Sequence, residues 1–275
     1  MRVHHINAGT MCPFVGDRMV CHCLVVETRD GLALVDSGIG LGDMAALRQR
    51  MGWGFTNVAR PRADPDDTAV RRIEKLGFAA SDVRHILVTH LDLDHAGGIP
   101  DFPGATVHAY RPEHDAAQAR ATYNEKNRYR PHQLRGAKWA LHEPDGQGDG
   151  WHGFAAVKPL PGLEDIAIVP LVGHTRGHAA IAVRDDAGWM LHCGDAYFNA
   201  AEMDVERPSC PLPLRLFQRV IAMDDAARRA NQDRLRALVR DHGRQVRVFC
   251  AHDASELERE TQAPVSAQPR AAASA

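Results

Sequence analysis

The segment from His90 to His95, which reads His-Leu-Asp-Leu-Asp-His, places four side chains that can bind a metal ion within six residues. It follows directly on a short apolar run, residues 85–89, whose β-branched content predicts a buried strand. Residues two apart in extended backbone face the same way, so His90 and Asp92 can bind one ion while Asp94 and His95, on the following turn, reach a second. Taken alone, the segment could also be a solvated acidic turn with incidental histidines.

Three later residues of ligand type also stand at the ends of predicted strands. His174 lies in Gly-His-Thr-Arg-Gly-His, directly after a strand and a glycine. Asp195 ends the apolar strand that carries Leu-His-Cys-Gly-Asp, and His252 ends the last strand of the chain. Strand ends bring distant segments together at one edge of a layered sheet, so this repeated placement favours a shared metal site over a solvated turn.

The hydrophobic pattern predicts an α/β chain with sheet layers inside and helices outside. We expect strands at residues 3–8, 20–27, 32–36, 85–89, 106–110, 166–172, 179–184, 189–193 and 246–251. We expect helices at residues 42–51, 68–76 and 112–122, and over 214–242 with one possible break. Residues 52–66 form an irregular loop in this interpretation, and residues 123–151 form a surface insertion or line a pocket for a polar substrate.

With no obvious linker between the two halves, residues 1–260 are expected to form a single domain. Residues 261–275, rich in Ala, Pro, Gln and Ser, have no periodic apolar face and are expected to be disordered.

Charge and composition limit the classes of partner. The formal net charge of −2 gives no overall field to attract nucleic acid or an anionic membrane, and no apolar run approaches a membrane span. The six cysteines are thinly spread without a secretory signal, so we expect a cytoplasmic protein without a disulfide framework. Cys21 and Cys23 are interpreted as small buried hydrophobic residues. The expected partner is a small-molecule substrate, and the sequence does not indicate an oligomeric state.

These motifs, in this order over nearly the whole ordered chain, resemble the metallo-β-lactamase superfamily, which carries HxHxDH, GHTxGH, a strand-end Asp and a strand-end His. The resemblance implies a four-layer αβ/βα sandwich with its site at one sheet edge. It further implies a first metal bound by His90, Asp92 and His174, a second bound by Asp94, His95 and His252, and Asp195 as the bridging carboxylate. Asp36 matches an aspartate of the family that orients the ligand loop.

One departure from the family pattern concerns the metal. The second histidine of HxHxDH is Asp92 here, which gives an HxDxDH variant and a harder ligand. Two divalent ions are expected, with zinc as the first expectation and manganese or iron as alternatives. The same position is acidic in the di-iron domain of flavodiiron proteins, which the chain also resembles in fold.

The resemblance and the ligand set together predict a dinuclear hydrolase that attacks an ester, lactone or thioester with metal-bound hydroxide. Asp195 would position this nucleophile, and one metal would polarise the substrate carbonyl. Tyr197 is a candidate donor to the oxyanion, with a plain core aromatic as the alternative interpretation. The competing function is a di-iron redox or oxygen-sensing domain, which Asp92 motivates.

Overall fold

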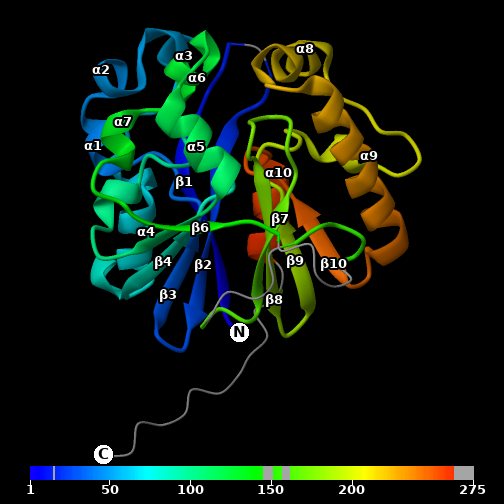
Figure 1. Ribbon diagram of the computed structural model, residues 1–275, viewed down its shortest axis with the longest axis horizontal. Coiled ribbons are helices and arrows are strands. Elements are labelled where there is room, and N and C mark those ends of the chain that lie inside the picture. Colours follow the sequence, from blue (N-terminus) through cyan, green and yellow to red (C-terminus); the bar gives the residue numbers. More distant parts are fainter. Residues whose placement is uncertain (15, 145–150, 157–161, 263–275) are drawn as a thin grey trace, which may run out of the picture.

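The computed structural model describes residues 1–14, 16–144, 151–156 and 162–262. Two β-sheets lie face to face, with helices on both outer sides (Figure 1). The larger sheet contains, in spatial order, β1 (Val3–Met11), β2 (Met19–Thr28), β3 (Gly31–Val35), β4 (Val83–Leu87), β5 (Thr106–Tyr110) and β6 (Lys138–His142). The smaller sheet contains β10 (Val246–Phe249), β9 (Gly188–His192), β8 (Ala179–Asp185) and β7 (Ile166–Pro170).

Strand direction explains where functional residues gather. In the larger sheet β1, β2 and β3 pair antiparallel, whereas β3 to β6 pair parallel. In the smaller sheet β7, β8 and β9 pair antiparallel, and β10 pairs parallel with β9. The carboxyl ends of β3, β4 and β5 therefore meet at one edge, and those of β9 and β10 meet at one edge of the second sheet.

Helices of the first half, among them α4 and α5, pack on the larger sheet, and α9 packs on the smaller one, whereas α8 lies at the top of the molecule (Figure 1). The helices are α1 (Leu41–Ala45), α2 (Leu47–Met51), α3 (Trp53–Val58), α4 (Ala69–Lys75), α5 (Arg111–Ala119), α6 (Tyr123–Arg128), α7 (Pro131–Leu134), α8 (Leu212–Ile221), α9 (Asp225–His242) and α10 (Ala254–Gln262). Four short 3-10 turns complete the described part: η1 (Pro65–Asp67), η2 (Ala80–Asp82), η3 (Ile99–Asp101) and η4 (Ala200–Met203).

Three of the four hydrophobic clusters among the described residues lie at the three interfaces between the four layers. Alternation along β3 sends Leu34 to the helix-facing core with Ile73 and Val35 to the core between the sheets. On the second sheet, Leu191 packs with Leu235 of α9. The expected four-layer αβ/βα sandwich is thus confirmed. Among the described residues no helix has the length and apolar content that crossing a membrane requires.

Three expectations about individual segments need correction. Residues 52–66 contain helix α3 and the turn η1. The segment 123–151 contains α6, α7 and strand β6, and its residues 145–150 lie outside the described residues. The second of these is not a surface insertion, because β6 pairs with β5 and Tyr129 is fully buried. Helix α10 was not expected, since its sequence is almost entirely polar. The expected break between residues 214 and 242 occurs between α8 and α9. Residues 263–275 of the expected tail lie outside the described residues.

Candidate metal centre

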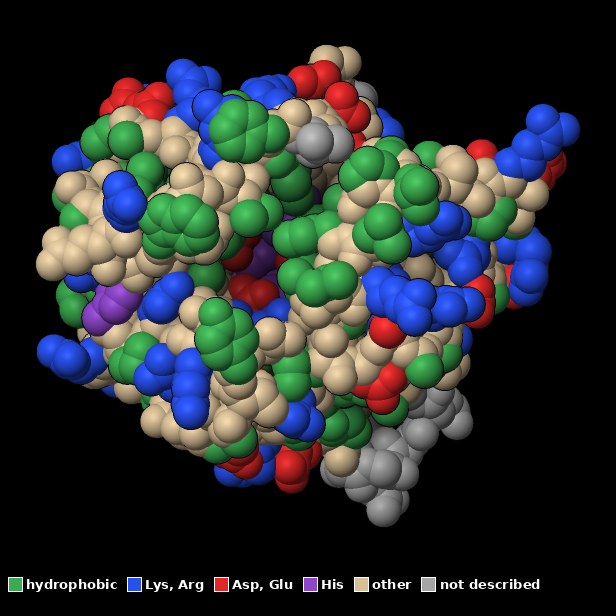
Figure 2. Space-filling model, turned by 90° about the horizontal axis from the view of Figure 1, so that it is seen from above, with side chains coloured by type: hydrophobic (Ala, Val, Ile, Leu, Met, Phe, Trp, Pro, Cys, Tyr) green, Lys and Arg blue, Asp and Glu red, His purple; other side chains and the backbone are tan. Residues whose placement is uncertain are grey.

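The upper face of the molecule is hollowed, and acidic and histidine side chains are visible inside the hollow (Figure 2). Hydrophobic side chains surround it. Helices α3, α6 and α8, which lie at the top of Figure 1, carry exposed large hydrophobic residues: Trp53, Val58, Tyr123, Leu212, Leu216, Phe217 and Val220. Because isolated exposed apolar residues are ordinary but a gathered set marks a binding surface, this face is a candidate for contact with an apolar ligand.

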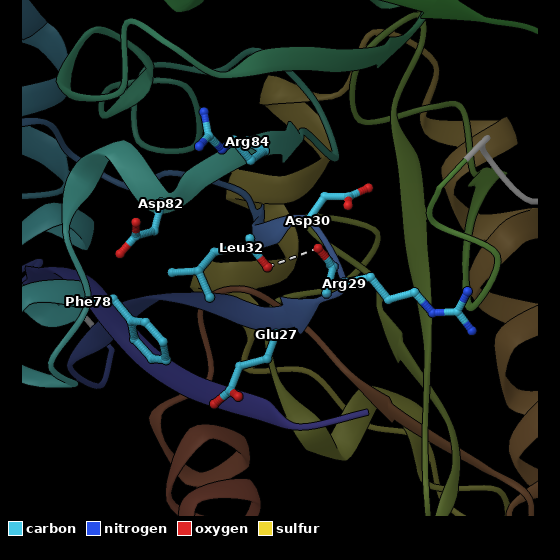
Figure 3. A pocket seen from close by; sticks show the side chains of 9 residues that line it. Glu27, Arg29, Asp30, Leu32, Phe78, Asp82 and Arg84 are labelled. Carbon is cyan, nitrogen blue, oxygen red and sulfur yellow. Dashed lines mark hydrogen bonds between the residues drawn. The ribbon is translucent and has the colours of Figure 1, made fainter. Parts of the chain in front are cut away.

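A second depression lies at the opposite end of the larger sheet. A pocket of about 340 Å³ is lined by the β2–β3 turn and by Phe78, Asp82 and Arg84 (Figure 3). Strand β3 begins in this pocket and ends next to Asp36, about 15 Å away at the usual rise of a strand. The pocket is therefore separate from the hollow that contains the histidines.

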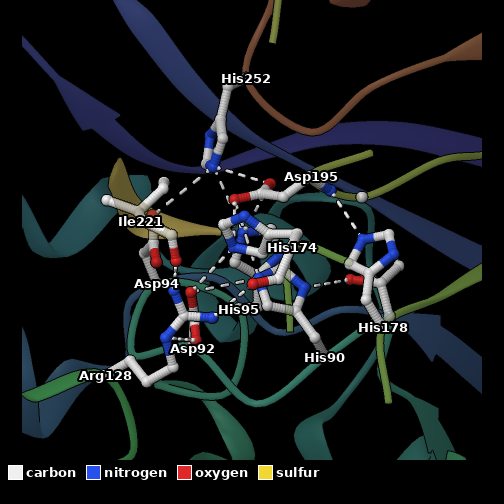
Figure 4. A network of polar contacts seen from close by, with 12 residues as sticks. His90, Asp92, Asp94, His95, Arg128, His174, His178, Asp195, Ile221 and His252 are labelled. Carbon is white, nitrogen blue, oxygen red and sulfur yellow. Dashed lines mark hydrogen bonds and ion pairs between the residues drawn. The ribbon is translucent and has the colours of Figure 1, made fainter. Parts of the chain in front are cut away.

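The seven residues that sequence reasoning assigned to the metals all lie beyond the ends of strands and face one another (Figure 4). His90, Asp92, Asp94 and His95 follow β4, and His174 follows β7. Asp195 follows β9, and His252 follows β10. All seven are buried. The fold thus brings together every one of these side chains, as the strand-end argument predicted.

The first group of ligand atoms comes from His90, Asp92, His174 and Asp195, which lie within 4.8 Å of one another. The Nε2 atom of His174 is 3.0 Å from Asp92 Oδ2 and 3.3 Å from Asp195 Oδ2. The Nε2 atom of His90 is 3.5 Å from Asp92 Oδ2 and 3.7 Å from Asp195 Oδ2. Ligands around a tetrahedral divalent ion are about 3.3 Å apart, so this group has the spacing of a coordination shell.

The second group comes from His95, Asp195 and His252. The Oδ1 atom of Asp195 is 3.2 Å from His95 Nε2 and 3.1 Å from His252 Nε2, and these two nitrogens are 3.3 Å apart. The two oxygens of Asp195 therefore face different groups, which is the geometry of a bridging carboxylate.

Asp94 stands slightly apart from both groups. Its Oδ2 atom is 3.6 Å from His252 Nε2, and it forms a third group of ligand atoms with Cys21 and His252. The sequence interpretation of Cys21 as a small buried hydrophobic residue is incomplete, because its thiol lies beside a carboxylate and an imidazole as well as beside Met11 and Ile39. Burial, followed by the charge of Asp94, raises the pKa of the Cys21 thiol well above its usual value.

Hydrogen bonds behind the imidazoles fix which ring nitrogen faces the centre. The Nδ1 atom of His252 lies 2.7 Å from the carbonyl oxygen of Val20, so Nδ1 carries the hydrogen. His95 Nδ1 donates to Asp36 in the same way, at 2.9 Å. Both rings can then present an unprotonated Nε2 to the centre, and two lone pairs 3.3 Å apart call for a cation between them.

A third imidazole is fixed through Thr89. The Thr89 hydroxyl donates to Asp36 Oδ2 at 2.8 Å, so it accepts from His90 Nδ1 at 2.9 Å. The predicted orienting role of Asp36 is consistent with these contacts, since its carboxylate also accepts from the Thr89 backbone N–H at 2.7 Å.

Buried atoms without partners support the same conclusion. His90 Nε2 and Asp195 Oδ1 are buried and have no hydrogen-bond partner among the described residues. Buried polar atoms are almost always satisfied, and imidazole together with carboxylate is a donor set for zinc, manganese or iron. The residues present therefore fit two divalent ions.

Electrostatics in the metal-free chain point the same way. Burial and the neighbouring His95 lower the pKa of His90 to about 4, so this ring is neutral at neutral pH and able to bind a metal. Burial alone would lower the pKa of His95, but the carboxylates of Asp195 and Asp36 outweigh it and hold that pKa well above its usual value. In the metal-free chain, a proton on His95 thus supplies positive charge beside the buried carboxylates.

Tyr197 does not face the centre as an oxyanion donor would. Its hydroxyl donates to the Glu256 carboxylate, with 3.0 Å to Oε1 and 3.2 Å to Oε2, and the side chain is fully buried. The residue next to it, Phe198, takes the position near the ligands: its ring stacks on His252 at a centroid distance of 5.2 Å and lies 5.9 Å from His174. The contacts of Tyr197 match the alternative interpretation of a core aromatic.

His178, the second histidine of the GHTRGH segment, supports Asp195 from behind. It accepts from the Asp195 backbone N–H through Nε2 at 3.0 Å, and its Nδ1 donates to the Leu171 carbonyl at 3.0 Å. Both ring nitrogens are therefore engaged away from the metal groups.

Sequence reasoning missed two buried charged residues from the helical layer. Glu113 of α5 accepts from the Leu91 N–H at 2.9 Å and from the Gly177 N–H at 3.0 Å, which fastens the two histidine-bearing loops to each other. Arg128 of α6 reaches the candidate ligands, with its Nε atom 3.5 Å from Asp92 Oδ1. Neither residue lies in a motif, and only the packing of the helices on the sheet brings them here.

Comparison with known proteins places the chain in a family. Residues 16–243 match the sequence profile of the Metallo-beta-lactamase superfamily. A probable metallo-hydrolase of Mycobacterium tuberculosis is 43% identical over 265 residues, which cover 95% of this chain and 84% of that protein. The N-acyl homoserine lactonase AttM of Rhizobium johnstonii is 30% identical over 160 residues, 56% of each protein.

Solved structures agree on the fold. A mutant of AiiA from Bacillus thuringiensis, solved with N-decanoyl-L-homoserine at its active site, has a TM-score of 0.69 and 21% identity, over 96% of this chain and 97% of that chain. A structure described as an N-acyl homoserine lactone hydrolase with N-hexanoyl-L-homoserine at its catalytic metal centre has a TM-score of 0.68 and the same identity and coverage. By its matched residues, its motifs and this fold, the chain belongs to the metallo-β-lactamase superfamily.

Proposed function

We propose that the chain is a dinuclear metal-dependent hydrolase that opens a lactone, with esters and thioesters as the related substrates. The single observation that carries the proposal is the position of Asp195, whose two oxygens face two separate groups of ligand atoms. His90, Asp92 and His174 would hold the first ion, and Asp94, His95 and His252 the second. When bound, two such ions lower the pKa of a water molecule toward about 7 and polarise a carbonyl oxygen.

The surrounding residues supply position and shape. Asp36 and Thr89 set the ring orientations of His90 and His95, and His178 holds the backbone of Asp195. Phe198 covers His174 and His252 with an apolar ring that carries no exchangeable proton and keeps bulk water off this side. The chain therefore provides a rigid, shielded carboxylate and imidazole frame at the floor of the hollow.

Relatives and the rim of the hollow suggest the substrate class. Proteins named as N-acyl homoserine lactonases are similar to this chain in sequence, and structural neighbours bind acyl homoserines. The hydrophobic residues of α3, α6 and α8 suit a substrate with an apolar portion. An acyl homoserine lactone is therefore the first compound to test.

The test compares N-hexanoyl- and N-decanoyl-homoserine lactone with an aryl ester and a thioester, using protein loaded separately with zinc, manganese and ferrous iron. Turnover is measured as the release of protons when the ester, thioester or lactone bond is hydrolysed. We expect metal-dependent opening of the lactones and its loss after chelation, with Asp195→Asn as the inactive control. Absence of metal-dependent turnover on every compound would contradict the proposal.

The carboxylate of Asp92 gives one reason to keep a di-iron redox or oxygen-sensing domain as the second candidate. Protein purified without added metal separates the two. Stoichiometric iron with an oxygen-sensitive visible absorption favours the redox function, whereas stoichiometric zinc without such absorption favours the hydrolase.

A further inference from the structure

The ligand set carries one more negative charge than the HxHxDH pattern would give it, because Asp92 stands in place of a neutral imidazole. Asp92, Asp94 and Asp195 are all buried at the centre. Buried charges are costly unless they are paired, so the extra carboxylate needs a compensating group nearby. This inference concerns the same centre as the proposed hydrolase and rests on it for the identity of the site.

Arg128 supplies that group. It is the last residue of α6, is 7% exposed, and points from the helical layer into the centre (Figure 4). Its Nε atom is 3.5 Å from Asp92 Oδ1, while Nη1 donates to the His174 carbonyl at 3.0 Å and Nη2 to the Ile221 carbonyl at 2.6 Å. One guanidinium thus contacts one metal-facing carboxylate and the backbone of a second metal-facing residue.

The contacts divide the two oxygens of Asp92 between two tasks. Oδ1 faces Arg128, whereas Oδ2 lies 3.0 Å from His174 Nε2 and 3.5 Å from His90 Nε2, inside the first group of ligand atoms. A carboxylate is shorter than an imidazole and is free to rotate about its χ2 angle. The charge of the guanidinium favours rotations that keep one carboxylate oxygen beside Arg128 and leave the other toward the first group of ligand atoms.

The backbone that carries Arg128 is itself fastened to the neighbouring ligand loop. Thr122 caps the start of α6 and forms a capping box with Glu125. The second oxygen of Glu125 accepts from Nε of Arg176 at 2.7 Å, and Arg176 lies two residues after His174. Helix α6 and the His174 loop are therefore tied at two points, which holds the guanidinium in place.

We propose that Arg128 is a positioning residue for the first metal, and that the Asp92–Arg128 pair replaces the neutral imidazole of the HxHxDH pattern as one unit. The pair is neutral overall, as a histidine would be. Each member depends on the other: Asp92 without Arg128 loses its orientation and its counter-charge, and Arg128 without Asp92 leaves a buried cation beside an incoming metal ion.

A double-mutant cycle tests this dependence. The proteins are wild type, Asp92→His, Arg128→Gln and the double variant, with zinc affinity measured by competition against a chromophoric chelator and bound zinc by elemental analysis. In each single variant the affinity for one of the two zinc ions should fall about 10- to 100-fold. The double variant, which restores a neutral ligand and removes the buried cation, should bind that equivalent within about tenfold of wild type, since the losses offset one another.

Three further proteins make the outcome specific. Arg128→Lys keeps the charge and should bind zinc better than Arg128→Gln. Arg240→Met, on the exposed face of α9, should match wild type. If Arg128→Gln fails to fold, Asp92→His is compared with the double variant Asp92→His/Arg128→Met. Removal of the arginine should then raise the zinc affinity of the Asp92→His protein.

Additive losses across the cycle, or Arg128→Gln binding both zinc ions like wild type, would overturn the proposal. Because metal affinity is the readout, a protein that shows this coupling but opens no lactone would contradict the proposed function and leave the role of Arg128 standing.

Discussion

The hydroxyl of Tyr197 lies 3.0 Å from Oε1 of Glu256, and this contact joins the loop after β9 to helix α10. Because the hydroxyl is engaged there, we expect Tyr197→Phe to retain the kcat of the wild-type protein on whichever substrate it hydrolyses. Loss of a hydrogen bond to a buried carboxyl group should lower the free energy of unfolding by about 1–2 kcal/mol. Parallel kinetics and urea denaturation check both parts, and a large fall in kcat with unchanged stability would restore the oxyanion role.

Glu256 should make stability depend on pH. Burial raises its pKa from the usual 4.5 to about 7, even though the Cys250 N–H donates to it at 2.7 Å. Since the folded-state pKa lies above the unfolded one, the protonated carboxyl favours the fold below about pH 4.5, and this contribution is lost as the pH rises through about 7.

The corresponding variant is Glu256→Gln, which keeps one acceptor oxygen for the Cys250 N–H and does not titrate. Between pH 5 and pH 8 the wild-type protein should lose up to about 3 kcal/mol of unfolding free energy through Glu256. The variant should not show this loss. Urea denaturation of metal-free protein at both pH values measures the difference, and parallel pH profiles for the two proteins would refute the assignment.

Asp36→Asn tests the support behind the ligands. The side chain accepts from Thr89 and from His95 Nδ1, and an asparagine tolerates the positive φ of 54° at this position. Replacing one oxygen by an amide group leaves His95 or Thr89 facing a donor, so metal affinity should fall about 10- to 100-fold. Competition with a chelator measures the affinity, and circular dichroism confirms that the variant is folded. Unchanged affinity would show that other contacts orient His95.

Metal binding should release protons. The carboxylates around His95 and His252 raise the pKa of both rings above the usual value despite burial, so a metal ion has to displace protons from them at neutral pH or below. Zinc affinity is therefore expected to fall as the pH is lowered below the raised pKa of these rings, by up to about tenfold per pH unit for each displaced proton. Isothermal titration in two buffers of different ionisation enthalpy counts the protons, and a count of zero would contradict these directions.

Gly177→Ala should disturb both stability and metal content. A Cβ atom at Gly177 would clash with the backbone nitrogen of Glu113, which does not move aside as the end of a flexible side chain would. We expect a loss of about 1–3 kcal/mol in unfolding free energy and less bound metal, because the clash displaces the loop that carries His174. Gly104→Ala is the matched control, since nothing lies within 4 Å of its Cβ position. Equal behaviour of the two variants would rule out this close approach.

Much of the site could be predicted because it is encoded in local sequence. The pattern from His90 to His95 and the later His174, Asp195 and His252 stand directly after apolar strand runs, and strand direction then gathers them at one edge. The layered fold was predictable for a related reason, since alternating and continuous apolar runs distinguish strands with one or two buried faces.

The residues that could not be predicted are those whose partners are set by packing between layers. Arg128 and Glu113 belong to short helices with no motif, and their side chains reach the centre only because those helices dock on the sheet. The direction of the Tyr197 hydroxyl depends on Glu256, in a helix whose largely polar sequence gives no core-facing signal. The sequence pattern identifies which residues can bind a metal, whereas the packing of the helices on the sheet determines which residues orient them.

The contact between His252 and β2 has a consequence for biosynthesis. Nδ1 of His252 donates to the carbonyl of Val20, so a candidate ligand near the end of the described residues is oriented by a strand near their beginning. During synthesis the first half of the protein leaves the ribosome with His90, Asp92, Asp94 and His95 but without His174, Asp195 and His252. If the chain binds two ions as proposed, the complete set of candidate ligands forms only after the segment that carries His252 has been made and has docked on β2.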